Sequence, residues 1–337
     1  MASVSCLMSV VCAAVALKSA QQGGKACILW VLRYNGAGVM KFYIVTPAYN
    51  ALQWLQGCVR SIADQVCDSV EVHHHVQDGG SSDGTQAWLE AWQLEHATTP
   101  GYKLTFESGK DEGLYDAINR AWRKLPDDAD ITAHLNADEQ YLPDVLAAVA
   151  AKAQEHPEAD LITTAHIVLD KDLRYICHRR PAFPNKYFSR LLTQIITNTC
   201  FYKASSFRAR NIYFDCSYRS LGDLIFFRDI METNPRILRL PQLFSSTFVV
   251  TGNNVSWTEV TNEERMRLNA QLPECVIKLR TICIKIHGAL SRLVDLMCSS
   301  PRHYAVYVGD SGARSTTNIQ APTTNWGMRT VGETNTP

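Results

Sequence analysis

Hydrophobic residues follow two alternating spacings from residue 40 onward. A run of apolar residues at 42–46 is typical of a buried strand, and Pro47 ends it. Apolar residues at 52, 55, 59 and 62 then recur every three or four positions, as on one face of a helix. Further strands are expected near 70–76, 104–106 and 131–135, and further helices near 85–92, 114–122 and 143–149. This order predicts an α/β fold with a mostly parallel open sheet flanked by helices.

The first 39 residues do not continue this pattern. They contain an apolar run at 7–17 and a glycine-containing stretch that is typical of a linker. The run has the length of a secretory signal, but no Lys or Arg precedes it, so a signal is not favoured, and it is too short to span a bilayer. Because the first clear strand opens at Met40, we expect residues 1–39 to be an N-terminal extension and translation to begin at Met40.

The last quarter of the chain has a different composition. Residues 261–298 are expected to be helical, with apolar residues interspersed with cations such as Lys278, Lys285 and Arg292. Two interpretations stay open for this segment, because it has the pattern both of a helix packed on the domain and of a helix on a membrane surface. Residues 299–337 are rich in Ser, Thr, Asn, Gly and Pro, which predicts a disordered tail.

The charge balance and the cysteines narrow the function classes. The 337 residues contain 33 Lys and Arg against 33 Asp and Glu, so the formal net charge is zero and no nucleic-acid partner is expected. The 11 cysteines form no CxxC or Cys/His pattern, which argues against a zinc site and against a disulfide framework. Unpaired thiols are typical of a reducing compartment, and we therefore expect a cytoplasmic protein.

Three consecutive histidines, His73, His74 and His75, lie in a predicted strand. Alternate residues of a strand face opposite sides, so at most two of the three share a face. We expect ordinary strand packing here and not a metal site.

Polar segments with glycines or acids follow the four predicted strands. They are TPAYN at 46–50, DGGSSDGT at 78–85, SGKDEGLYDAIN at 108–119 and NADE at 136–139. In an open parallel sheet, ligands bind beyond the carboxyl ends of the strands, where such segments meet. Carboxylates gathered at one edge repel one another unless a cation compensates them. We therefore expect Mg²⁺ or Mn²⁺, which use one or two carboxylates and bridge phosphates, together with a nucleoside diphosphate.

In this order and spacing the segments resemble those of the inverting glycosyltransferases of family 2, which have the GT-A nucleotide-diphospho-sugar transferase fold. The resemblance runs from residue 41 to about 257 and rests on IVTPAYN, VQDGGSSDGT, SGKDEGLYDAINRAW, HLNADEQYLP and SLGDLIFFRD. The DGG, GLYDAIN and Asn-first variants are most similar to bacterial enzymes of the colanic-acid and exopolysaccharide type. The resemblance implies a GT-A domain at residues 40–260.

The resemblance also implies a set of donor-binding residues. Thr46, Pro47 and Tyr49 would border the nucleobase, and Asp78 would contact it. The remaining nucleotide-sugar residues would be Asp111, Tyr115, Asp116, Asn119 and Asn136. For Tyr115 and Asp116, helix packing and capping are the alternative.

The metal motif departs from the family pattern. The family has two acidic residues in this motif, whereas the first position here is Asn136. The resemblance leaves Asp138 as the metal ligand and Glu139 as an assisting one. Because an amide still hydrogen-bonds ribose or a metal-bound water, we expect a loosened site and not a dead one.

The resemblance places the catalytic base at Asp223, in the motif SLGDLIFFRD. A helix cap is the alternative, since Asp is also common at that position. Asp215 and Asp229 match the family less well. As base, Asp223 would take a proton from an acceptor hydroxyl, which attacks the anomeric carbon opposite the leaving diphosphate and inverts it.

The expected function is transfer of a sugar from a UDP- or GDP-sugar to a hydroxyl of a saccharide or lipid-linked acceptor, in polysaccharide or glycolipid assembly. A nucleotidyltransferase is one alternative, although the first strand lacks a basic, phosphate-gripping glycine-rich segment. A non-catalytic nucleotide-sugar-binding relative is another, which Asn136 suggests. We expect peripheral contact with the inner face of the cell membrane through residues 276–297.

Overall fold

A computed structural model describes residues 38–181, 196–252, 259–270, 273–309 and 311–324. The predictions for the apolar run at 7–17 and for a start at Met40 lie outside the described residues or are not tested by them. The first half of the described chain alternates strands and helices in the predicted order. Its elements are β1 (Met40–Ala48), α3 (Leu52–Ala63), β2 (Val70–Asp78), α4 (Thr85–Glu95), β3 (Tyr102–Ser108), α5 (Leu114–Trp122), β4 (Ile131–His134) and α6 (Val145–Glu155).

The second half is less regular. Its elements are β5 (Leu161–Asp170), β6 (Tyr175–Arg179), the 3₁₀ turn η2 (Thr197–Thr199), β7 (Cys200–Lys203), α8 (Ala204–Arg210), α9 (Gly222–Glu232), β8 (Ile237–Val250), α10 (Glu259–Ala270), α11 (Glu274–Met297), β9 (His303–Tyr307) and β10 (Arg314–Asn318). None of the described helices is long and apolar enough to cross a membrane.

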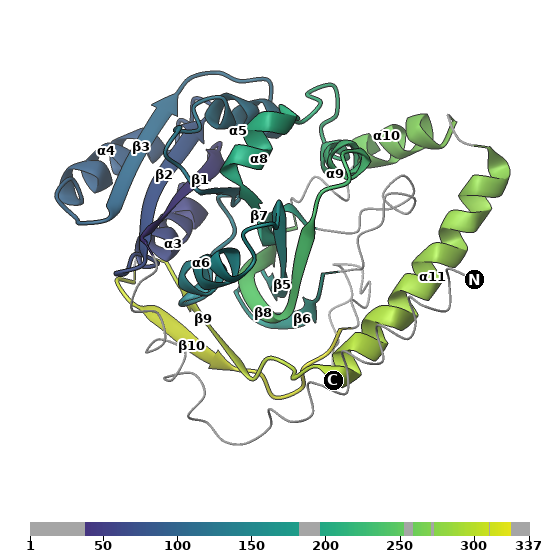
Figure 1. Ribbon diagram of the computed structural model, residues 1–337. Helices are drawn as coiled ribbons and strands as arrows, with labels where there is room; N and C mark the ends of the chain where they lie inside the picture. Colours follow the sequence, from purple (N-terminus) through teal and green to yellow (C-terminus); the bar gives the residue numbers. More distant parts are fainter. Residues whose placement is uncertain (1–37, 182–195, 253–258, 271–272, 310, 325–337) are drawn as a thin grey trace, which may run out of the picture. The chain divides into compact units, whose positions relative to one another are not determined.

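The strands β1 to β8 form one sheet of eight, in the order β3-β2-β1-β4-β7-β5-β6, with β8 paired to β5 (Figure 1). The pairings β3-β2, β2-β1, β1-β4 and β5-β8 are parallel, whereas those of β7 and β6 are antiparallel. The predicted α/β fold with a mostly parallel sheet is therefore confirmed. The antiparallel strands all belong to the second half, for which the hydrophobic pattern made no prediction.

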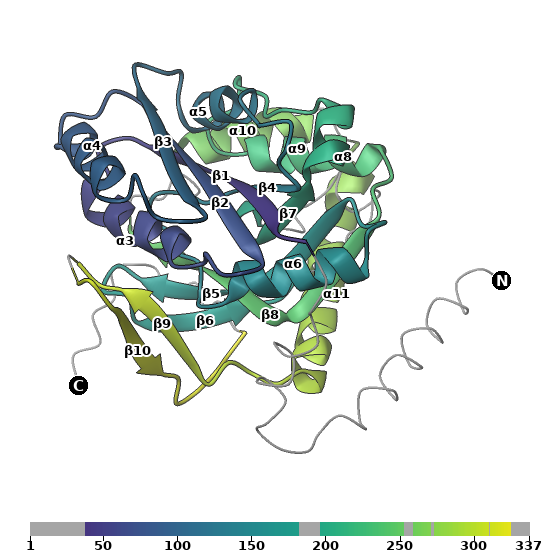
Figure 2. The same ribbon diagram turned by 60° about the vertical axis from the view of Figure 1, so that its left-hand side comes forward.

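Helices cover both faces of the sheet (Figures 1 and 2). Because side chains alternate along a strand, Phe42 and Ile44 of β1 point to one face, and Tyr43 and Val45 point to the other. The first pair packs with α3, α4 and α6, and the second with α5, α8 and α9. With a core on each face, the carboxyl ends of β1 to β4 remain the open edge where a ligand can bind.

The histidine triplet packs as predicted. His74 is fully buried and its Nε2 lies 2.9 Å from the Thr46 hydroxyl oxygen, while His73 and His75 share the Thr105 hydroxyl on the other face. Burial lowers the pKa of His73 to about 4 and that of His74 to about 3, so both are neutral at pH 7. In the described part of the chain, no group of three or more His, Cys, Asp or Glu could hold a metal ion.

The prediction of a disordered tail from residue 299 is wrong for the described residues up to 324. Strands β9 and β10 pair in antiparallel fashion, and Tyr304 and Val306 of β9 are 2% and 1% exposed within the larger core. The composition is polar because only one face of this hairpin is buried. Two core side chains among many Ser, Thr and Asn residues were too weak a signal to indicate a strand.

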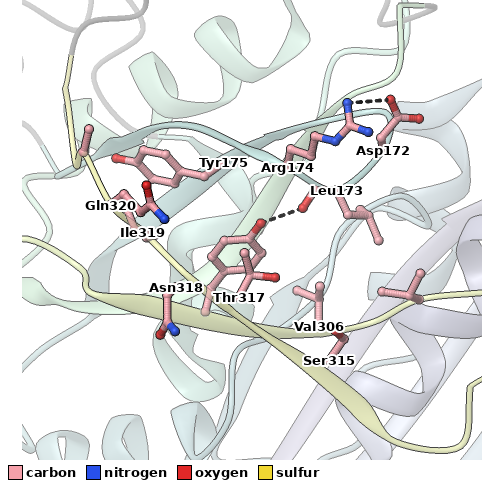
Figure 3. A pocket seen from close by; sticks show the side chains of 13 residues that line it. Asp172, Leu173, Arg174, Tyr175, Val306, Ser315, Thr317, Asn318, Ile319 and Gln320 are labelled. Carbon is pink, nitrogen blue, oxygen red and sulfur yellow. Dashed lines mark hydrogen bonds and ion pairs between the residues drawn. The ribbon is translucent and has the colours of Figure 1, made fainter.

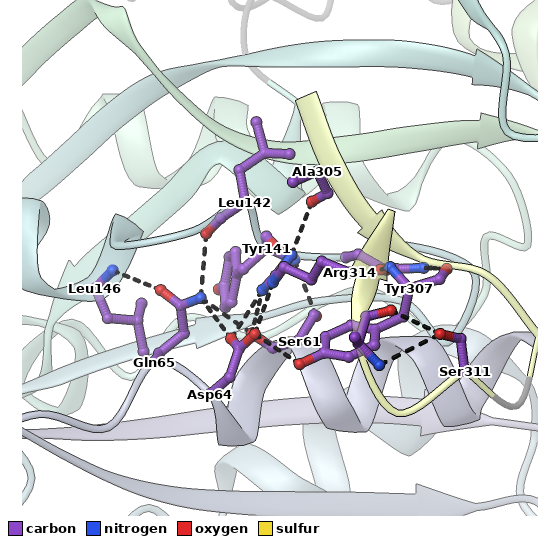
Figure 4. A network of polar contacts seen from close by, with 12 residues as sticks. Ser61, Asp64, Gln65, Tyr141, Leu142, Leu146, Ala305, Tyr307, Ser311 and Arg314 are labelled. Carbon is purple, nitrogen blue, oxygen red and sulfur yellow. Dashed lines mark hydrogen bonds and ion pairs between the residues drawn. The ribbon is translucent and has the colours of Figure 1, made fainter. Parts of the chain in front are cut away.

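One arginine fastens the hairpin to the rest of the fold (Figure 4). The Arg314 guanidinium donates two hydrogen bonds to the Asp64 carboxylate after α3, at 2.6 and 2.8 Å, and others to the carbonyl oxygens of Tyr141 and Ala305. The Tyr307 hydroxyl donates to the same Asp64 carboxylate at 2.8 Å. A bidentate arginine–carboxylate pair of this kind is stronger and geometrically more specific than an isolated surface ion pair.

We expect Arg314→Ala to lower the free energy of unfolding by about 2 kcal/mol, because it leaves two partly buried carbonyls and the Asp64 carboxylate without their charged donor. Arg302→Ala, an exposed side chain of the same segment, should change it by less than about 0.5 kcal/mol. Urea unfolding of both variants measures the difference. Equal free energies of unfolding for the two variants would indicate that Arg314 does not fasten the hairpin to the rest of the fold.

A cavity of about 480 Å³ lies where this hairpin meets the β5–β6 turn (Figure 3). The Tyr304 hydroxyl donates to the Leu173 carbonyl at 2.7 Å, and the Arg174 side chain pairs with Asp172 at 3.6 Å. None of the predicted site residues lines this cavity. It is a gap beside the hairpin and not the candidate site.

Candidate active site

A larger cavity, of about 920 Å³, lies beyond the carboxyl ends of β1, β2 and β3. Its walls come from the segments after these strands, from the first turn of α5, and from the chain just before α9. The lining residues include Pro47, Ala48, Tyr49, Gly79, Gly80, Lys110, Asp111, Glu112, Gly113, Leu114, Tyr115, Asp116, Ala117, Cys216, Tyr218, Arg219 and Val260. Five residues of the predicted donor site, Pro47, Tyr49, Asp111, Tyr115 and Asp116, are therefore brought together.

Glycines keep the floor of this cavity open. A Cβ atom on Gly79 would lie 2.9 Å from an Asp111 carboxylate oxygen and 3.2 Å from the Tyr49 ring. Gly80 has φ +84°, a left-handed conformation that glycine adopts without strain. The segment after β2 thus needs glycine both for its backbone and for close approach.

Two acids hold the start of α5 in place. The Asp111 carboxylate accepts a hydrogen bond from the Gly113 amide at 2.9 Å. Asp116 accepts one from the Glu112 amide at 3.0 Å and pairs with Arg120, one helical turn later, at 2.7 Å. Both carboxylates border the cavity while their oxygens also stabilise the loop.

Four predicted donor residues, Thr46, Asp78, Asn119 and Asn136, are not among the residues that line this cavity. Thr46 is fully buried because strand alternation turns its side chain to the core, where it meets His74. Asp78 is also fully buried, and its carboxylate accepts hydrogen bonds from the Ser81 amide and the Ser81 and Ser108 hydroxyls. These bonds organise the loop that forms the floor of the cavity, and the contact of Asp78 with a nucleobase stays a prediction.

Asn119 is the third. Its amide is 1% exposed and forms two hydrogen bonds with the Phe214 backbone, at 2.8 and 3.0 Å. This reciprocal pair ties α5 to the segment before α9. Asn119 therefore positions the chain behind the cavity, and its role in donor binding stays a prediction.

The metal motif follows β4, which pairs with β1. Asp138 is half-buried, and burial raises the pKa of its carboxyl group to about 6. The side-chain oxygen of Asn136 is buried and has no hydrogen-bond partner among the described residues. An unpaired amide oxygen near a half-buried carboxylate fits a divalent cation that completes its shell with water and phosphate oxygens.

Glu139 does not fit the assisting metal role that the resemblance implied. It is 1% exposed, and its two carboxylate oxygens accept hydrogen bonds from the Asn136 amide at 2.9 Å and from the Asn198 side chain at 2.8 Å. Burial and the neighbouring Asp138 raise the pKa of Glu139 well above its usual value. Glu139 holds the loop in shape from inside.

Asp223 lies in the first turn of α9. Leu221 is the N-cap residue and no side chain caps the helix, so the alternative of Asp223 as the cap is wrong. Its carboxylate accepts a hydrogen bond from the Leu224 amide at 2.7 Å, and burial raises the pKa of the carboxyl group to about 6. A pKa near the working pH suits a general base.

Tyr115 lines the cavity and also contacts the first turn of α9, which contains Asp223. Its hydroxyl donates to the Ser220 carbonyl at 2.8 Å and accepts from the Asp223 amide at 3.3 Å. A Cβ atom on Gly222 would lie 2.4 Å from the Tyr115 ring, so only glycine permits this contact. The donor-side helix α5 and the start of α9 are thereby held together through one side chain.

Glu264 of α10 supports the same turn from the other side. Its carboxylate accepts three backbone hydrogen bonds, from Arg219, Ser220 and Leu221, at 2.6, 3.1 and 2.9 Å. The residue is 7% exposed. Nothing in the polar pattern of 259–270 indicated this role, because the partners lie more than 40 residues earlier.

The other acids weighed as base are less suited. Asp215 accepts a hydrogen bond from the Ser217 amide within an exposed turn, and Asp229 pairs with its neighbour Arg228 at 3.0 Å. Two cations that received no role, Lys110 and Arg219, line the cavity. Lys110 lies within one of the motifs and Arg219 directly before another. Their positive charge could therefore have indicated a role beside a diphosphate.

Comparison with known proteins agrees with this geometry. The family model described as glycosyl transferase family 2 matches residues 43–216, which is more than half of the 337 residues. A glycosyltransferase of PGL/p-HBAD biosynthesis from Mycobacterium bovis (strain BCG / Pasteur 1173P2) is 34% identical over 140 residues, and one from Mycobacterium tuberculosis (strain ATCC 25177 / H37Ra) is equally similar. The match covers 40% of this chain and spans half the length of each relative.

Solved structures share the fold. The structure of S. aureus TarS 1-349 in complex with UDP-GlcNAc has a TM-score of 0.53 at 20% identity, covering 68% of this chain and 64% of that one. The complex of the same fragment with UDP has a TM-score of 0.50 at 19% identity, covering 71% and 70%. The predicted GT-A fold is confirmed, and the chain belongs to glycosyl transferase family 2.

Proposed function

We propose that the protein is an inverting glycosyltransferase that moves a sugar from a nucleotide-diphosphate donor to a hydroxyl of a saccharide or lipid-linked acceptor. The observation that carries the proposal is the link between Asp223 and the cavity. Tyr115 lines the cavity at the strand ends, and its hydroxyl accepts a hydrogen bond from the backbone amide of Asp223. Asp223 is not among the lining residues, and its half-buried carboxyl group has a raised pKa. A donor bound in this cavity and the proposed base Asp223 would therefore be connected through Tyr115.

The cavity has the character of a donor site. Lys110 and Arg219 on its wall would balance the charge of a diphosphate. Tyr49, 66% exposed, offers a ring for contact with a base. The S. aureus TarS structures were solved with UDP-GlcNAc and with UDP, which favours a UDP-sugar over a GDP-sugar as donor.

In the reaction, the Asp223 carboxylate takes the proton of the acceptor hydroxyl as its oxygen attacks the anomeric carbon. The carbon–oxygen bond to the diphosphate breaks on the opposite face, so the configuration inverts. Asp138 and the Asn136 oxygen would hold Mg²⁺ or Mn²⁺, which would neutralise the charge that develops on the leaving diphosphate. Glu139 and Glu264 keep the two loops in shape by accepting hydrogen bonds from backbone amides.

A panel of UDP- and GDP-sugars tests the proposal. The purified protein should release UDP from one donor at a slow rate in water, and faster with saccharide or lipid-linked acceptors; NMR of the product should show the inverted linkage. Binding of UDP-sugars without release in any combination would identify a non-catalytic relative, the alternative that Asn136 favours. Failure to bind any nucleotide sugar would contradict the proposal altogether.

We also propose that the protein works inside the cell, at the inner face of the membrane, where nucleotide sugars and lipid-linked acceptors meet. The membrane contact is argued separately below.

A further inference from the structure

Helix α11 exposes a row of large apolar side chains. Leu279, Ile282, Ile286, Leu290, Leu293 and Met297 are each between 43% and 54% exposed, and we call these six residues the α11 apolar face. They recur every three or four positions, so they lie on one side of the helix. With 24 residues the helix is about 36 Å long. A row of this length is far more than the isolated exposed apolar residues of an ordinary surface.

The opposite side of the helix is fastened to the sheet. Asp295 stands nine positions after Ile286, which places it about half a turn away from the apolar face. Its carboxylate accepts hydrogen bonds from the His178 ring at 2.7 Å and from the Arg180 guanidinium at 3.1 Å. Arg180 also donates to the Ser299 carbonyl just beyond the helix, at 2.8 Å. The contacts at this end leave the apolar face directed away from the sheet.

Cations border the apolar face on one edge. Lys278, Lys285 and Arg292 are spaced by seven residues, and each lies roughly 80 to 120° around the helix from Ile286. Lys278 pairs with Glu274 in the first turn at 2.8 Å, and between Glu274 and Asp295 the sequence contains no Asp or Glu. Long basic side chains beside an apolar row bury their stems in an apolar layer and keep their charge at its rim. The helix therefore carries a local positive charge in a chain whose net charge is zero.

Three surfaces could cover the α11 apolar face: a second copy of the helix, the segment 1–39 of this chain, or a lipid bilayer. The charge pattern distinguishes between them. Residues 275–294 contain no Asp or Glu. A second copy of α11, whether parallel or antiparallel to the first, would therefore bring cations against cations. The segment 1–39 of this chain also contains no Asp or Glu, but three basic residues. An anionic lipid surface offers an apolar layer and negative headgroups at once.

We propose that the α11 apolar face docks on the surface of an anionic lipid bilayer, with Lys278, Lys285 and Arg292 at the level of the headgroups. The helix would lie in the plane of the interface and not cross it, in agreement with the absence of a membrane-spanning helix among the described residues. This inference deepens the location given under the proposed function, and it stands on α11 alone. Vesicle binding without sugar transfer would leave it intact and contradict only the proposed reaction.

Sedimentation with vesicles tests the docking of the full chain. Vesicles of phosphatidylcholine mixed equally with phosphatidylglycerol should pellet the protein, and vesicles of phosphatidylcholine alone should pellet at least about tenfold less. Leu279→Asn combined with Leu293→Asn should weaken binding by about tenfold or more, because two side chains no longer enter the acyl layer. Leu94→Asn combined with Met266→Asn, at 81% and 64% exposed positions elsewhere, is the matched control and should bind as the parent does.

If the Leu279→Asn, Leu293→Asn variant folds poorly, a variant that removes a positive charge tests the proposal instead. Lys285→Gln should weaken binding to the anionic vesicles by about fivefold, whereas Lys103→Gln on β3 should not change it. Equal binding to neutral and anionic vesicles would overturn the proposal. So would a parent protein that ignores vesicles and forms dimers in solution that Leu279→Asn with Leu293→Asn dissociates, because the face would then be an interface between copies.

Discussion

Asp223→Asn is expected to lower the rate of sugar transfer by about 10² or more while UDP affinity stays near that of the parent. The amide keeps the shape of the carboxylate and can still accept from the Leu224 amide, but it cannot take a proton from the acceptor. The melting temperature should not fall, because the variant removes a carboxyl group whose charged form burial disfavours. Transfer rate, UDP calorimetry and thermal unfolding on this one variant provide the measurements.

The pH profile gives a second readout of the same group. Burial raises the pKa of Asp223 to about 6, so the base is protonated and inactive below that pH and free to act above it. Transfer by the parent should therefore rise through pH 6 and level off, and this rise should be absent from the residual rate of Asp223→Asn. Asp229→Asn, an exposed acid on the same helix, is the matched control and should keep both rate and profile. Near-parental transfer by Asp223→Asn would remove the residue from the mechanism.

Asp138→Ala should abolish the part of UDP binding that depends on a divalent ion. Asp138 is the one Asp of the motif NADE, and the structure turns its neighbour Glu139 inward to hold the Asn136 amide. No other carboxylate of the motif is placed to take over. Calorimetry of UDP with and without Mn²⁺ measures the effect, which should exceed tenfold in the presence of the metal and vanish in its absence.

Asn136→Asp is the complementary variant. It restores the family's acidic residue at the position whose amide oxygen is now unpaired, so metal-dependent UDP binding should stay equal or increase. If the parent binds UDP equally well with and without Mn²⁺, the metal role of Asp138 is wrong. Glu139→Gln separates the two acids, since it should disturb the loop and its stability more than the metal dependence.

The sequence predicted the first half of the fold closely, because each strand and helix there has its own hydrophobic period. It also predicted which segments meet, since the ends of parallel neighbours share one edge of a sheet. Tyr115 shows the limit of this reasoning. Its place near the donor was implied by the motif, but its bond to the turn of Asp223 joins residues 108 positions apart. No local pattern records such a contact.

Three of the predicted donor residues that do not line the cavity are turned inward for a common physical reason. Thr46, Asp78 and Asn119 stand in motifs that border the cavity, yet each side chain turns inward to satisfy buried backbone or side-chain groups. A motif gives the position of the backbone, whereas the direction of a polar side chain depends on which partners the packed core leaves for it. The hairpin at 303–318 was missed for a related reason, because Arg314, which fastens it, finds its partners just after α3 and after β4.

The order in which the chain is synthesised gives this hairpin a further consequence. The Gln140 side chain, directly after the metal motif, exchanges two hydrogen bonds with the Tyr307 backbone, at 2.9 and 2.7 Å, across 167 residues. At the usual pace of translation the second partner leaves the ribosome roughly 10 to 30 seconds after the first. A nascent chain that already has its first four parallel strands must wait for its last strands to secure that loop. Nucleotide binding should therefore appear only after Tyr307 has left the ribosome.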